Sequence, residues 1–497
     1  MKKIVFIEPK PSDLHVFTRM ALPRLGTVLL GTILKNHGYT VKSYVENVSE
    51  LDLADVLTAD AVGISTITST AKRSYEIAKL LRKTGIPVFI GGPHATFLPD
   101  EALESCDYVI RGEADDCIVD FIKALETGKG FEYVAGLSYR DSNGIVTHNK
   151  STATCKDVDK LPCPDFTLIS GLEQHGSKKF SITPIMTSRG CPFDCSFCSV
   201  TGMFGQKYRF RSKEHVMEEL IANKNSGSNW VFFYDDNFIA HKNRTKELLH
   251  TMINSKVTPN WTAQVRVEVA KDQELLDLMK KSGCHTVYIG FESINPETLK
   301  LYNKKQSIED IESCIKILHK NGIRIHGMFV FGSDMDTTDT IQETVRFAKR
   351  NDLESVQFLI LTPLPGTKCY RDLESENRII SKDWSLYDAH HVVFEPKLMT
   401  YYQLQSEMLR ATKNFYTIGQ IVKRAARFDL FNVALKTYGR NMTRTWEKKN
   451  QYFIDYTKTL TEAGKTIELA AKKTAEDIKE KFKQLELAGA VPHLKTH

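Results

Sequence analysis

Two runs of alternating strand and helix patterns occur in this chain, and no other sequence feature restricts the fold as strongly. The first run lies in residues 1–126, where short apolar segments are separated by segments with helical spacing. We expect strands at KIVFIE, YTVKSYVE, VGIST, VFIGG and YVIRGE, which are residues 3–8, 39–46, 62–66, 88–92 and 108–113. This alternation predicts an α/β domain with a doubly wound parallel sheet, whose ligands bind at the carboxyl edge of the strands.

The second run begins near residue 182 and contains six strand patterns, of which the first five precede a helical pattern. The strands are ITPIMTSRG, WVFFYDDN, WTAQVRVE, TVYIGFES, RIHGMFVFG and SVQFLILTP, at residues 182–190, 230–237, 261–268, 286–293, 324–332 and 355–363. Six βα-type repeats predict a (βα)6 partial TIM barrel. In such a barrel the reactive side chains lie at the carboxyl ends of the strands.

The chain of 497 residues is too long for one hydrophobic core, so we divide it into four parts. Residues 1–130 and 181–383 hold the two alternations, and the turn-rich residues 131–180 predict a linker. Residues 384–497 predict a helical region, in which apolar side chains recur with helical spacing over 416–437. A Lys/Glu-rich helix follows, with one apolar face formed by Ile467, Ala471, Ile478, Phe482 and Leu485.

Composition and charge narrow the functional class. The formal net charge of +6 is small for this length, and basic residues are interspersed with acidic ones through the two main domains. We therefore expect no nucleic-acid partner. The first apolar run, residues 4–7, is a strand pattern rather than a signal peptide. No run reaches the roughly 18 apolar residues of a membrane-spanning helix, and we expect a cytoplasmic protein.

Three of the ten cysteines lie within eight residues, in the stretch TSRGCPFDCSFCS at residues 187–199. A structural zinc site usually takes four Cys or His ligands, and no second pair lies nearby. An odd number of thiols in a reducing compartment argues against disulfides. Three thiolates suit an iron–sulfur cluster with one iron left open, and the ligands would be Cys191, Cys195 and Cys198.

The motif Cys-x-x-x-Cys-x-x-Cys after an opening strand, here Cys191-PFD-Cys195-SF-Cys198, resembles the radical S-adenosylmethionine (SAM) superfamily. The resemblance implies a [4Fe-4S] cluster bound by these cysteines, with SAM chelated by the open iron. It also implies reductive cleavage of SAM to a 5′-deoxyadenosyl radical, which abstracts hydrogen from a substrate. The aromatic residue before the last cysteine, Phe197, would lie near the adenine of SAM.

Further SAM contacts follow from the resemblance at the ends of the predicted strands. The family commonly has Gly-Gly-Glu after the second strand to hold the SAM amino group, whereas this chain has Asp235 and Asp236 before an asparagine. These residues also suit a helix cap, and both interpretations stay open. The other expected SAM contacts are Gln264 and Arg266 on the third strand, Glu292 and Ser293 on the fourth, Gly327 on the fifth and Pro365 in the turn LTPLPGT. A solvated strand end is the other interpretation of Arg266, and ordinary turn chemistry is that of Gly327 and Pro365.

Given this match, the first domain resembles the cobalamin (B12)-binding domain that precedes the radical SAM core in a large class of these enzymes. The turns GIST, IGGPHAT and RGEAD supply the expected cobalamin contacts Ser65, Thr66, Gly91, Gly92, His94, Gly112 and Glu113. For His94, a structural loop residue is the more common role. The motif Asp-x-His-x-x-Gly, whose histidine ligates cobalt in many such domains, is incomplete, because no glycine follows Asp13-Leu14-His15 at the required spacing. We therefore expect cobalamin to bind without His15.

The resemblance implies methyl transfer from methylcobalamin to an unactivated carbon. Relatives in this class also form rings on tetrapyrroles or couple carbon atoms of lipids, and this chemistry is a second interpretation. A non-catalytic iron–sulfur sensor is a third. The expected partners are a small-molecule substrate, hydrophobic on the second interpretation, and an electron donor such as flavodoxin or ferredoxin. The basic amphipathic segment 416–437 is either a helical cap on the barrel or a peripheral membrane contact.

Overall fold

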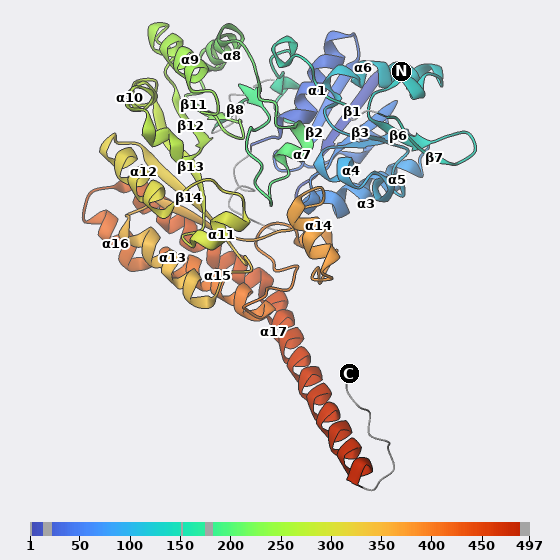
Figure 1. The fold of residues 1–497 in the computed structure, drawn as a ribbon. Coiled ribbons are helices and arrows are strands. Elements are labelled where there is room, and N and C mark those ends of the chain that lie inside the picture. Colours follow the sequence, from blue (N-terminus) through green and yellow to red (C-terminus); the bar gives the residue numbers. More distant parts are fainter. Residues whose placement is uncertain (1, 13–21, 151–152, 174–181, 488–497) are drawn as a thin grey trace.

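The computed structural model describes residues 2–12, 22–150, 153–173 and 182–487, and it contains two large sheets that lie side by side (Figure 1). Asp13, Leu14 and His15 lie outside the described residues. Most side chains after residue 465 are also outside them, including those expected to form the last apolar face: Ile467, Ala471, Ile478, Phe482 and Leu485.

The first sheet has seven strands in the order β2-β1-β3-β4-β5-β6-β7. They are β1 (Lys3–Glu8), β2 (Thr40–Val45), β3 (Ala61–Ser65), β4 (Val88–Gly91), β5 (Tyr108–Ile110), β6 (Leu137–Arg140) and β7 (Val146–His148). The first five run parallel, and β6 and β7 are antiparallel additions. The main connecting helices are α1 (Leu25–Asn36), α2 (Leu53–Val56), α3 (Ala71–Arg82), α4 (Pro93–Phe97), α5 (Pro99–Leu103) and α6 (Ile118–Thr127).

Alternate residues of β1 pack into different cores, which confirms the predicted doubly wound sheet. Ile4 and Phe6 join the core beneath α1 and α6, whereas Val5 and Ile7 join the core beneath α3. Successive side chains of a strand point to opposite faces, so an apolar run such as KIVFI requires helices on both faces.

The segment predicted as a linker begins with β6 and β7, which extend the first sheet. The Asp141 carboxylate accepts hydrogen bonds from the backbone N–H groups of Asn143 and Ile145, both at 2.9 Å, and thereby forms the hairpin turn. The two strands have four and three residues. Such short strands show no clear alternation in the sequence; β6 forms by pairing with β5, and β7 forms by pairing with β6.

The second sheet has six parallel strands in the order β15-β14-β13-β12-β11-β8. They are β8 (Thr183–Ile185), β11 (Trp230–Phe233), β12 (Asn260–Val265), β13 (Cys284–Glu292), β14 (Arg324–Phe331) and β15 (Ser355–Ile360). The outer helices are α8 (Lys213–Asn225), α9 (Lys242–Asn254), α10 (Gln273–Lys281), α11 (Pro296–Leu301), α12 (Ile308–Lys320) and α13 (Thr338–Arg350). The first and last strands of this order are not paired with each other within the described chain, so the predicted partial barrel is confirmed.

The inner face of the barrel is less buried than its outer face. On β13, Val287, Ile289 and Phe291 are buried beneath the outer helices, whereas the alternate Thr286 and Tyr288 are only half-buried. Half-buried residues on the inner face show that the lumen is not filled by side chains. This partial barrel therefore differs from a closed eight-stranded barrel, whose interior is packed.

Two short strands and two short helices lie at the carboxyl ends of the barrel strands. The strands β9 (Ser188–Arg189) and β10 (Arg209–Phe210) pair antiparallel, and α7 (Val200–Phe204) lies between them in the sequence. Helix α14 (Lys368–Ser375) follows the turn after β15. These elements lie between the barrel and the first sheet.

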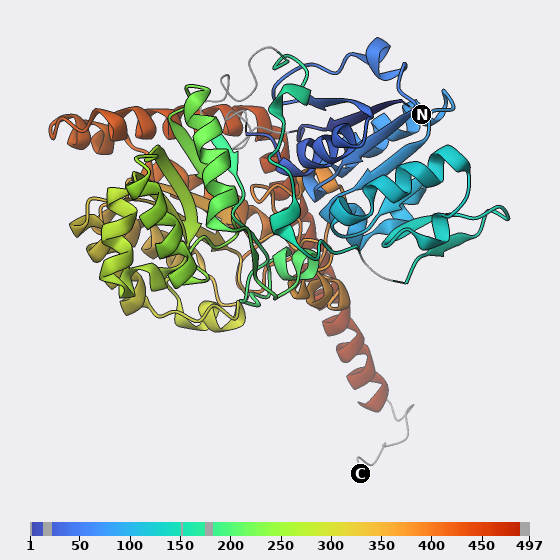
Figure 2. The ribbon, with the colours of Figure 1, turned by 90° about the horizontal axis from the view of Figure 1, so that it is seen from above.

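The carboxyl-terminal region is helical, as predicted, and consists of α15 (Tyr401–Phe415), α16 (Ile418–Ala425) and α17 (Leu430–Leu487). The Tyr416 phenol accepts a hydrogen bond from Val356 N at 3.0 Å and donates one to Val356 O at 2.7 Å, which anchors the region on β15. Helix α17 is kinked at Asn450, and its distal part projects from the body (Figures 1 and 2). None of the helices in the described part of the chain is long and apolar enough to cross a membrane.

Candidate functional site

The three clustered cysteines lie in the loop between β9 and α7, at the carboxyl end of the first barrel strand. Backbone bonds hold this loop against the ends of two helices. Ser196 N donates to Tyr302 O at 3.1 Å, just after α11, and Cys369 N of α14 donates to Ser196 O at 2.9 Å. Asn303 Nδ2 also donates to Asp194 O at 2.7 Å. The loop is therefore positioned by elements distant in the sequence.

Gly190 makes the turn from β9 into the cysteine loop. Its φ of +87° is in the region that favours glycine, and a Cβ atom there would lie 2.7 Å from Lys207 O. Any other residue would be strained and would collide with the backbone.

The donor set fits an iron–sulfur cluster better than a single metal ion. In the described part of the chain, one group of three potential metal-ligand atoms lies within 4.8 Å of one another, and it does not include these cysteines. The sulfur atoms of the three clustered cysteines are therefore farther apart than that. One ion needs its ligands close together, whereas in a cluster each thiolate binds a different iron. Burial raises the pKa of the Cys191 and Cys198 thiols, and the nearby Asp236 and Cys195 raise both further. These side chains therefore face the same space.

Asp235 and Asp236 have different surroundings. Asp235 is buried and accepts hydrogen bonds from Thr187 N at 2.7 Å, from Ser188 N at 3.0 Å and from the Thr187 hydroxyl. It ties the end of β11 to the segment that leads into the cysteine loop. Asp236 has no hydrogen bond or ion pair with any described residue, and burial together with Asp235 raises its pKa to about 7. Asp236 is thus the carboxylate available to a cationic ligand.

Arg266 supports the cysteine loop from the end of β12. Its guanidinium lies 3.7 Å from the centroid of the Phe193 ring, between the first two cluster cysteines, and pairs with Glu268 at 3.3 Å. With only 7% of its surface exposed, Arg266 is not a solvated strand end. Gln264 is half-buried two residues earlier and lies on the same side of the chain as the lumen-lining Thr262.

Glu292 forms a buried ion pair at the end of β13. Its Oε1 lies 2.7 Å from Lys304 Nζ, and both side chains are more than nine-tenths buried. The backbone of Glu292 has a φ of +62°, which is uncommon for a residue with a side chain. A Cβ atom at Gly290 would lie 2.1 Å from the Glu292 carboxylate, so this glycine leaves room for the pair. Such strain is typical of functional sites.

The remaining predicted SAM contacts also have structural partners. The Ser293 hydroxyl accepts a hydrogen bond from Asn295 N at 3.0 Å. Gly327 faces the core, where a Cβ atom would lie 3.0 Å from Leu353 and 3.1 Å from Phe291. The Phe197 ring packs edge-on against Tyr302 with centroids 5.0 Å apart. Whether these residues touch SAM stays a prediction.

The turn that contains Pro365 contacts the first domain. Pro365 is buried, and the following Gly366 has a φ of +85°. A Cβ atom at Gly366 would lie 2.3 Å from the ring of Phe97, the last residue of α4. Gly202 of α7 leaves similar room, with its Cβ position 3.0 Å from the same ring. Phe97 is therefore inserted between two glycines of the barrel domain.

The predicted cobalamin contacts lie at the carboxyl edge of the first sheet. Several of them already make hydrogen bonds or close contacts with other residues of the protein. The Thr66 hydroxyl bonds to Ser74, and a Cβ atom at Gly92 would lie 2.5 Å from Thr66 O. Gly112 N donates to the Thr96 hydroxyl at 2.9 Å. Ser65 and Gly91 are half-buried at this edge, and the nearest atom to a Cβ at Gly91 would be 3.6 Å away. A ligand could therefore approach the backbone at Gly91.

His94 is fully buried between the first sheet and the barrel domain. Its ring nitrogens lie 3.3 Å from the Thr68 hydroxyl and 3.4 Å from the Glu101 carboxylate. The Trp384 ring packs edge-on against it at 5.0 Å and donates a hydrogen bond to the same Glu101 at 2.8 Å. This environment favours the structural role of His94.

Arg24 is a residue of this edge that the sequence reasoning missed. It follows β1, forms an ion pair with the buried Glu8 at 3.3 Å and leaves its Nη1 atom buried without a hydrogen-bond partner. The charges of Glu8, Arg24 and Asp236 all affect the pKa of Tyr234, which burial raises to about 12. The carboxyl edges of the two sheets therefore face each other. An unpartnered guanidinium nitrogen suits the amide oxygens of a corrin ring, so this edge fits cobalamin.

Glu113, a predicted cobalamin contact, instead bridges the two domains. Its carboxylate accepts hydrogen bonds from Arg189 at 2.9 Å and from Arg209 at 2.5 Å. Asp115 pairs with Arg189 at 2.6 Å. Arg189 directly precedes Gly190 and the first cysteine. Its position beside the cysteine motif is the one feature of the sequence that could have indicated a role at the site.

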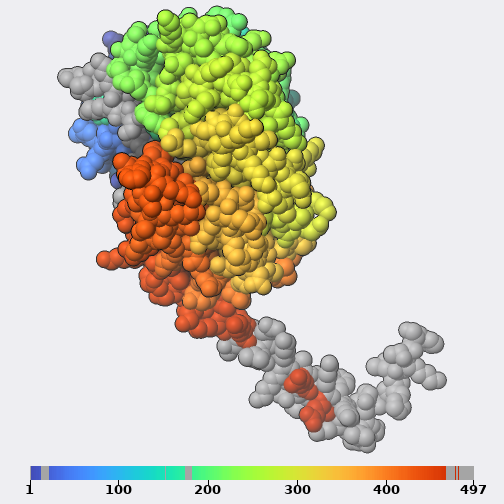
Figure 3. Space-filling model, turned by 90° about the vertical axis from the view of Figure 1, so that its left-hand side faces the viewer, coloured from blue at the N-terminus to red at the C-terminus, as the bar shows by residue number. Residues whose placement is uncertain are grey.

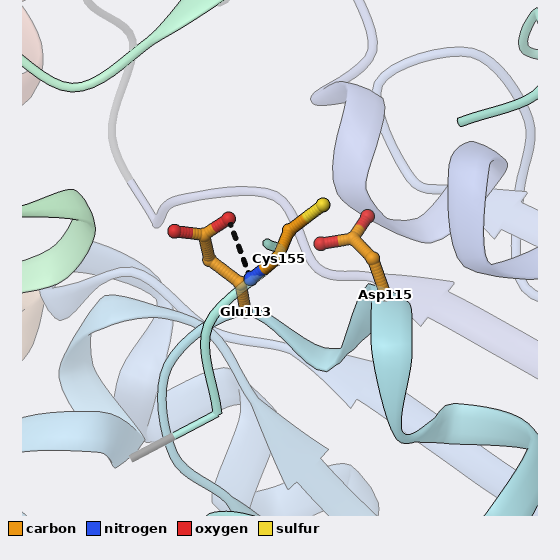
Figure 4. A group of neighbouring side chains, drawn as sticks. All are labelled: Glu113, Asp115 and Cys155. Carbon is orange, nitrogen blue, oxygen red and sulfur yellow. Dashed lines mark hydrogen bonds between the residues drawn. The ribbon is translucent and has the colours of Figure 1, made fainter. Parts of the chain in front are cut away.

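Glu113, Asp115 and Cys155 form a close group that resembles a metal site (Figure 4). Cys155 N donates to Glu113 at 3.3 Å, and burial raises the pKa of the Cys155 thiol to about 12. Both carboxylates are already paired with arginines, and a neutral thiol is a poor ligand. The group is therefore an ion-pair network.

A cavity of about 440 Å³ occupies the amino-terminal half of the barrel lumen. Its walls come from the first residues of β11, β13, β14 and β15, and from helices α15 and α17. Aromatic and aliphatic side chains form most of the lining. The volume lies in the range of pockets that bind small molecules. No sequence motif marks this cavity, because its lining comes from residues far apart in the chain.

Two family models match the chain. The model described as radical SAM superfamily matches residues 185–348, and the model described as B12 binding domain matches residues 18–122. These ranges contain the cysteine loop and the first sheet, respectively.

Several curated proteins resemble most of the chain. An uncharacterized methyltransferase of Pyrococcus horikoshii is 30% identical over 84% of this chain and 92% of its own length. The bacteriochlorophyllide d C-12(1)-methyltransferase of Chlorobaculum tepidum is 30% identical over 85% of this chain and 89% of its own length. The anaerobic magnesium-protoporphyrin IX monomethyl ester cyclase of Cereibacter sphaeroides is 27% identical, over 83% and 70%.

Solved structures share the fold. The cobalamin-dependent SAM radical enzyme OxsB with aqua-cobalamin superposes with a TM-score of 0.70 at 18% identity, over 90% of this chain and 72% of that chain. The radical SAM methyltransferase TsrM of Kitasatospora setae, with cobalamin and a [4Fe-4S] cluster bound, gives 0.64 at 18% identity, over 76% and 75%.

Proposed function

Because the chain belongs to the radical SAM superfamily and carries the B12-binding domain of its cobalamin-dependent members, we propose that it transfers a methyl group to an unactivated carbon of a small molecule. Membership confirms the predicted family and its cofactors: SAM, a [4Fe-4S] cluster and cobalamin. The chain is an enzyme of this family. Methyl transfer is supported by the two relatives named as methyltransferases at 30% identity.

One observation carries the proposal: the carboxyl edges of the two sheets face each other and are fastened together. Glu113 of the first domain pairs with Arg189, next to the cysteine loop. Phe97 fills the space left by Gly366. A cobalamin at the first edge would therefore lie opposite the cluster loop. A substrate carbon between the two edges would be within reach of both cofactors.

The roles of the residues follow from this arrangement. Cys191, Cys195 and Cys198 hold the cluster, which together with SAM and cobalamin supplies radical hydrogen abstraction and a transferable methyl group. The Asp236 carboxylate faces the SAM ammonium, because it is half-buried and has no other described partner. Arg266 holds Phe193, and thereby the loop, in place.

The lumen isolates the reacting groups from bulk water. The outer face of the barrel is closed by helices, and the amino-terminal end of the lumen is covered by α15 and α17. Excluding water protects a reactive intermediate from side reactions. We propose that the substrate lies in this lumen and extends to the carboxyl ends of the strands, where its reacting carbon faces both cofactors.

Ring formation is the alternative reaction, favoured by the cyclase relative. Isotope labelling separates the two. The reconstituted protein would be incubated anaerobically with a chemical reductant, hydroxocobalamin, SAM carrying a deuterated methyl group and a panel of apolar small molecules. Methyl transfer predicts a product that gains one deuterated methyl group. A product that loses hydrogen without gaining the label would contradict methyl transfer and support ring formation.

Three variants test the cluster assignment in the same assay. Cys191→Ala, Cys195→Ala and Cys198→Ala should each abolish formation of 5′-deoxyadenosine, since each removes a cluster ligand. Cys163→Ala is a matched control, because Cys163 is also a half-buried thiol but lies outside the loop. Full activity in any of the three loop variants would reject the assignment.

A further inference from the structure

The surface formed by α16, the turn at Phe428 and the first turns of α17, which we call the α16–α17 face, exposes large apolar side chains. Ile418 and Val422 are 60% and 59% exposed on α16. Phe428, in the turn between the helices, and Leu430, the first residue of α17, are 89% and 74% exposed. Contiguous apolar side chains of this size mark an interaction site. Figure 3 looks onto the side of the molecule where these helices lie, in orange-red.

The backbone conformation of the turn is a second indication of an interaction site. Phe428 has a φ of +56°, a strained conformation for an aromatic residue. Its ring is exposed rather than packed, so no burial within the described chain offsets the strain. Strain that holds an apolar ring in solvent indicates that the ring contacts something outside the chain.

The same segment carries a positive charge. Residues 416–450, which extend this face along α17, contain eight basic and two acidic residues, and although Arg424 and Lys436 are buried, the remaining six basic residues are still an excess of cations. Lys423, Arg424 and Arg427 all lie beside the Asp352 carboxylate, and Arg424 pairs with Asp429 as well. Apolar side chains flanked by an excess of cations are the pattern of a helix that lies on an anionic membrane surface.

The wall of the lumen cavity reaches this face. Phe431 is 43% exposed and also lines the cavity, where its ring packs on His285 at 4.8 Å and lies beneath Arg324 at 5.1 Å. Leu435 and Met442, on the following turns of α17, line the cavity as well. The exposed apolar face and the apolar cavity are therefore continuous along α17.

The charged groups of the cavity wall already have neighbours, since Glu354 accepts a hydrogen bond from Ile325 N at 3.0 Å and Arg324 lies over the Phe431 ring, whereas three neutral polar atoms have no partner in the described chain. Thr262 Oγ1, His326 Nε2 and Trp446 Nε1 are buried, line the cavity and have no hydrogen-bond partner in the described chain. His326 is 8% exposed, and burial lowers its pKa to about 4, so its ring is uncharged. Buried polar groups are normally hydrogen-bonded, which points to a ligand with a hydroxyl or carbonyl group on an apolar skeleton.

We propose that the α16–α17 face docks on an anionic lipid bilayer, and that the lumen cavity beneath it takes up a membrane-dissolved, uncharged and largely apolar substrate. The proposal that the protein docks on a membrane is based on the exposed apolar side chains of this face and on its positive charge. The substrate part rests on the proposed function, because it assigns the molecule that this enzyme would act on. A helical cap would leave Phe428 and Leu430 without a reason to be exposed.

Vesicle flotation of the full reconstituted chain tests the docking. Vesicles of equal parts phosphatidylglycerol and phosphatidylcholine should carry the protein, and vesicles of phosphatidylcholine alone should carry much less, with added salt releasing it. Phe428→Gly removes the ring and also suits the positive φ, so the variant should fold at least as well. Combined with Leu430→Ser, it should lower binding about tenfold or more, because two apolar side chains no longer enter the lipid.

Two matched controls exclude general effects. Asn377→Gly changes another exposed residue with positive φ, and Tyr133→Ser removes an aromatic residue that is 85% exposed on the first domain. Both should bind vesicles like the unchanged protein. Equal binding to the two vesicle types, or equal binding of the Phe428→Gly/Leu430→Ser variant, would overturn the docking. Formation of 5′-deoxyadenosine without substrate, measured on the same samples, reports on the radical SAM core independently.

Binding of N-phenyl-1-naphthylamine, an uncharged apolar fluorescent probe, tests the cavity. Thr262→Phe fills the cavity and should weaken probe binding about tenfold or more, as expected for loss of buried apolar contact. Thr262→Val keeps the volume and should bind the probe like the unchanged protein. Unchanged affinity in Thr262→Phe, or an equal loss in Thr262→Val, would reject the cavity as an apolar site.

Discussion

Glu113 accepts a hydrogen bond at 2.9 Å from Arg189, the residue that precedes the turn into the cysteine loop. Glu113 belongs to the cobalamin-binding domain, and Arg189 belongs to the barrel domain. The Glu113 side chain is buried, and only 11% of the Arg189 side chain is exposed. The pair therefore couples the position of the cysteine loop to the first domain.

Glu113→Gln should reduce the iron content and the rate of SAM cleavage more than the affinity for cobalamin. The substitution leaves Arg189 and Arg209 with a weaker partner, and breaking a buried ion pair costs about 3–5 kcal/mol. Iron analysis, 5′-deoxyadenosine formation and cobalamin binding would be measured together. Glu46→Gln is the control, because Glu46 pairs with Arg73 within the first domain. Loss of cobalamin binding with normal iron content would favour the direct contact expected from the sequence.

Asp235→Asn and Asp236→Asn should have different effects. Asp235 holds the segment before the cysteine loop through three hydrogen bonds, so Asp235→Asn should lower the midpoint of thermal unfolding and the iron content. Asp236→Asn should leave both unchanged and weaken SAM binding about tenfold, since a charge-assisted contact is lost. Equilibrium dialysis with SAM measures the second effect. Identical behaviour of the two variants would show that the two carboxylates do not have separate roles.

Gly290→Ala should displace the Glu292 side chain without touching any cluster ligand. The added methyl group would lie 2.1 Å from the Glu292 carboxylate. We expect weaker SAM binding with an unchanged iron content, the same result as for Glu292→Ala. Gly464→Ala is the control, because a Cβ atom there meets no atom within 4 Å. Normal SAM affinity in both Gly290→Ala and Glu292→Ala would show that the ion pair between Glu292 and Lys304 has only a structural role.

Lys436 should make stability depend on pH between about 8 and 10. Burial, with Arg424 nearby, lowers its pKa from 10.5 to about 8 in the folded protein. The folded state therefore favours the neutral amine, so its contribution to stability is present above the unfolded pKa and is lost as pH falls through about 8. Lys436→Met should raise the free energy of unfolding at pH 7 by about 3 kcal/mol, the equivalent of this pKa shift.

The measurement is the difference in unfolding free energy between Lys436→Met and the unchanged protein across pH 7 to pH 10.5, the usual lysine value. The difference should shrink as pH rises, because deprotonation removes the penalty of the buried charge. Lys448→Met, at an exposed position of the same helix, should show no such trend. A constant difference would mean that Lys436 remains charged without cost, for example through its position 4.1 Å above the Phe415 ring.

The sequence alone determined the two sheets, because their strands are buried apolar runs with clear helical patterns between them. It also predicted Cys191, Cys195 and Cys198 as the cluster ligands, since they are close in the chain and their spacing is typical of that chemistry. The short strands β6 and β7 were not visible, because three or four residues do not establish an alternation.

Only the tertiary structure decided which of the remaining polar residues face the site. Asp235 and Asp236 are neighbours in the sequence, yet one is bonded to the backbone before the loop and the other is unpartnered. Likewise, the role of Glu113 depends on its ion pair with Arg189, which lies in the other domain, and the wall of the lumen cavity is completed by residues of α17. The physical reason is that ion pairs and cavities join residues far apart in the chain, whereas sequence patterns record only neighbours along it.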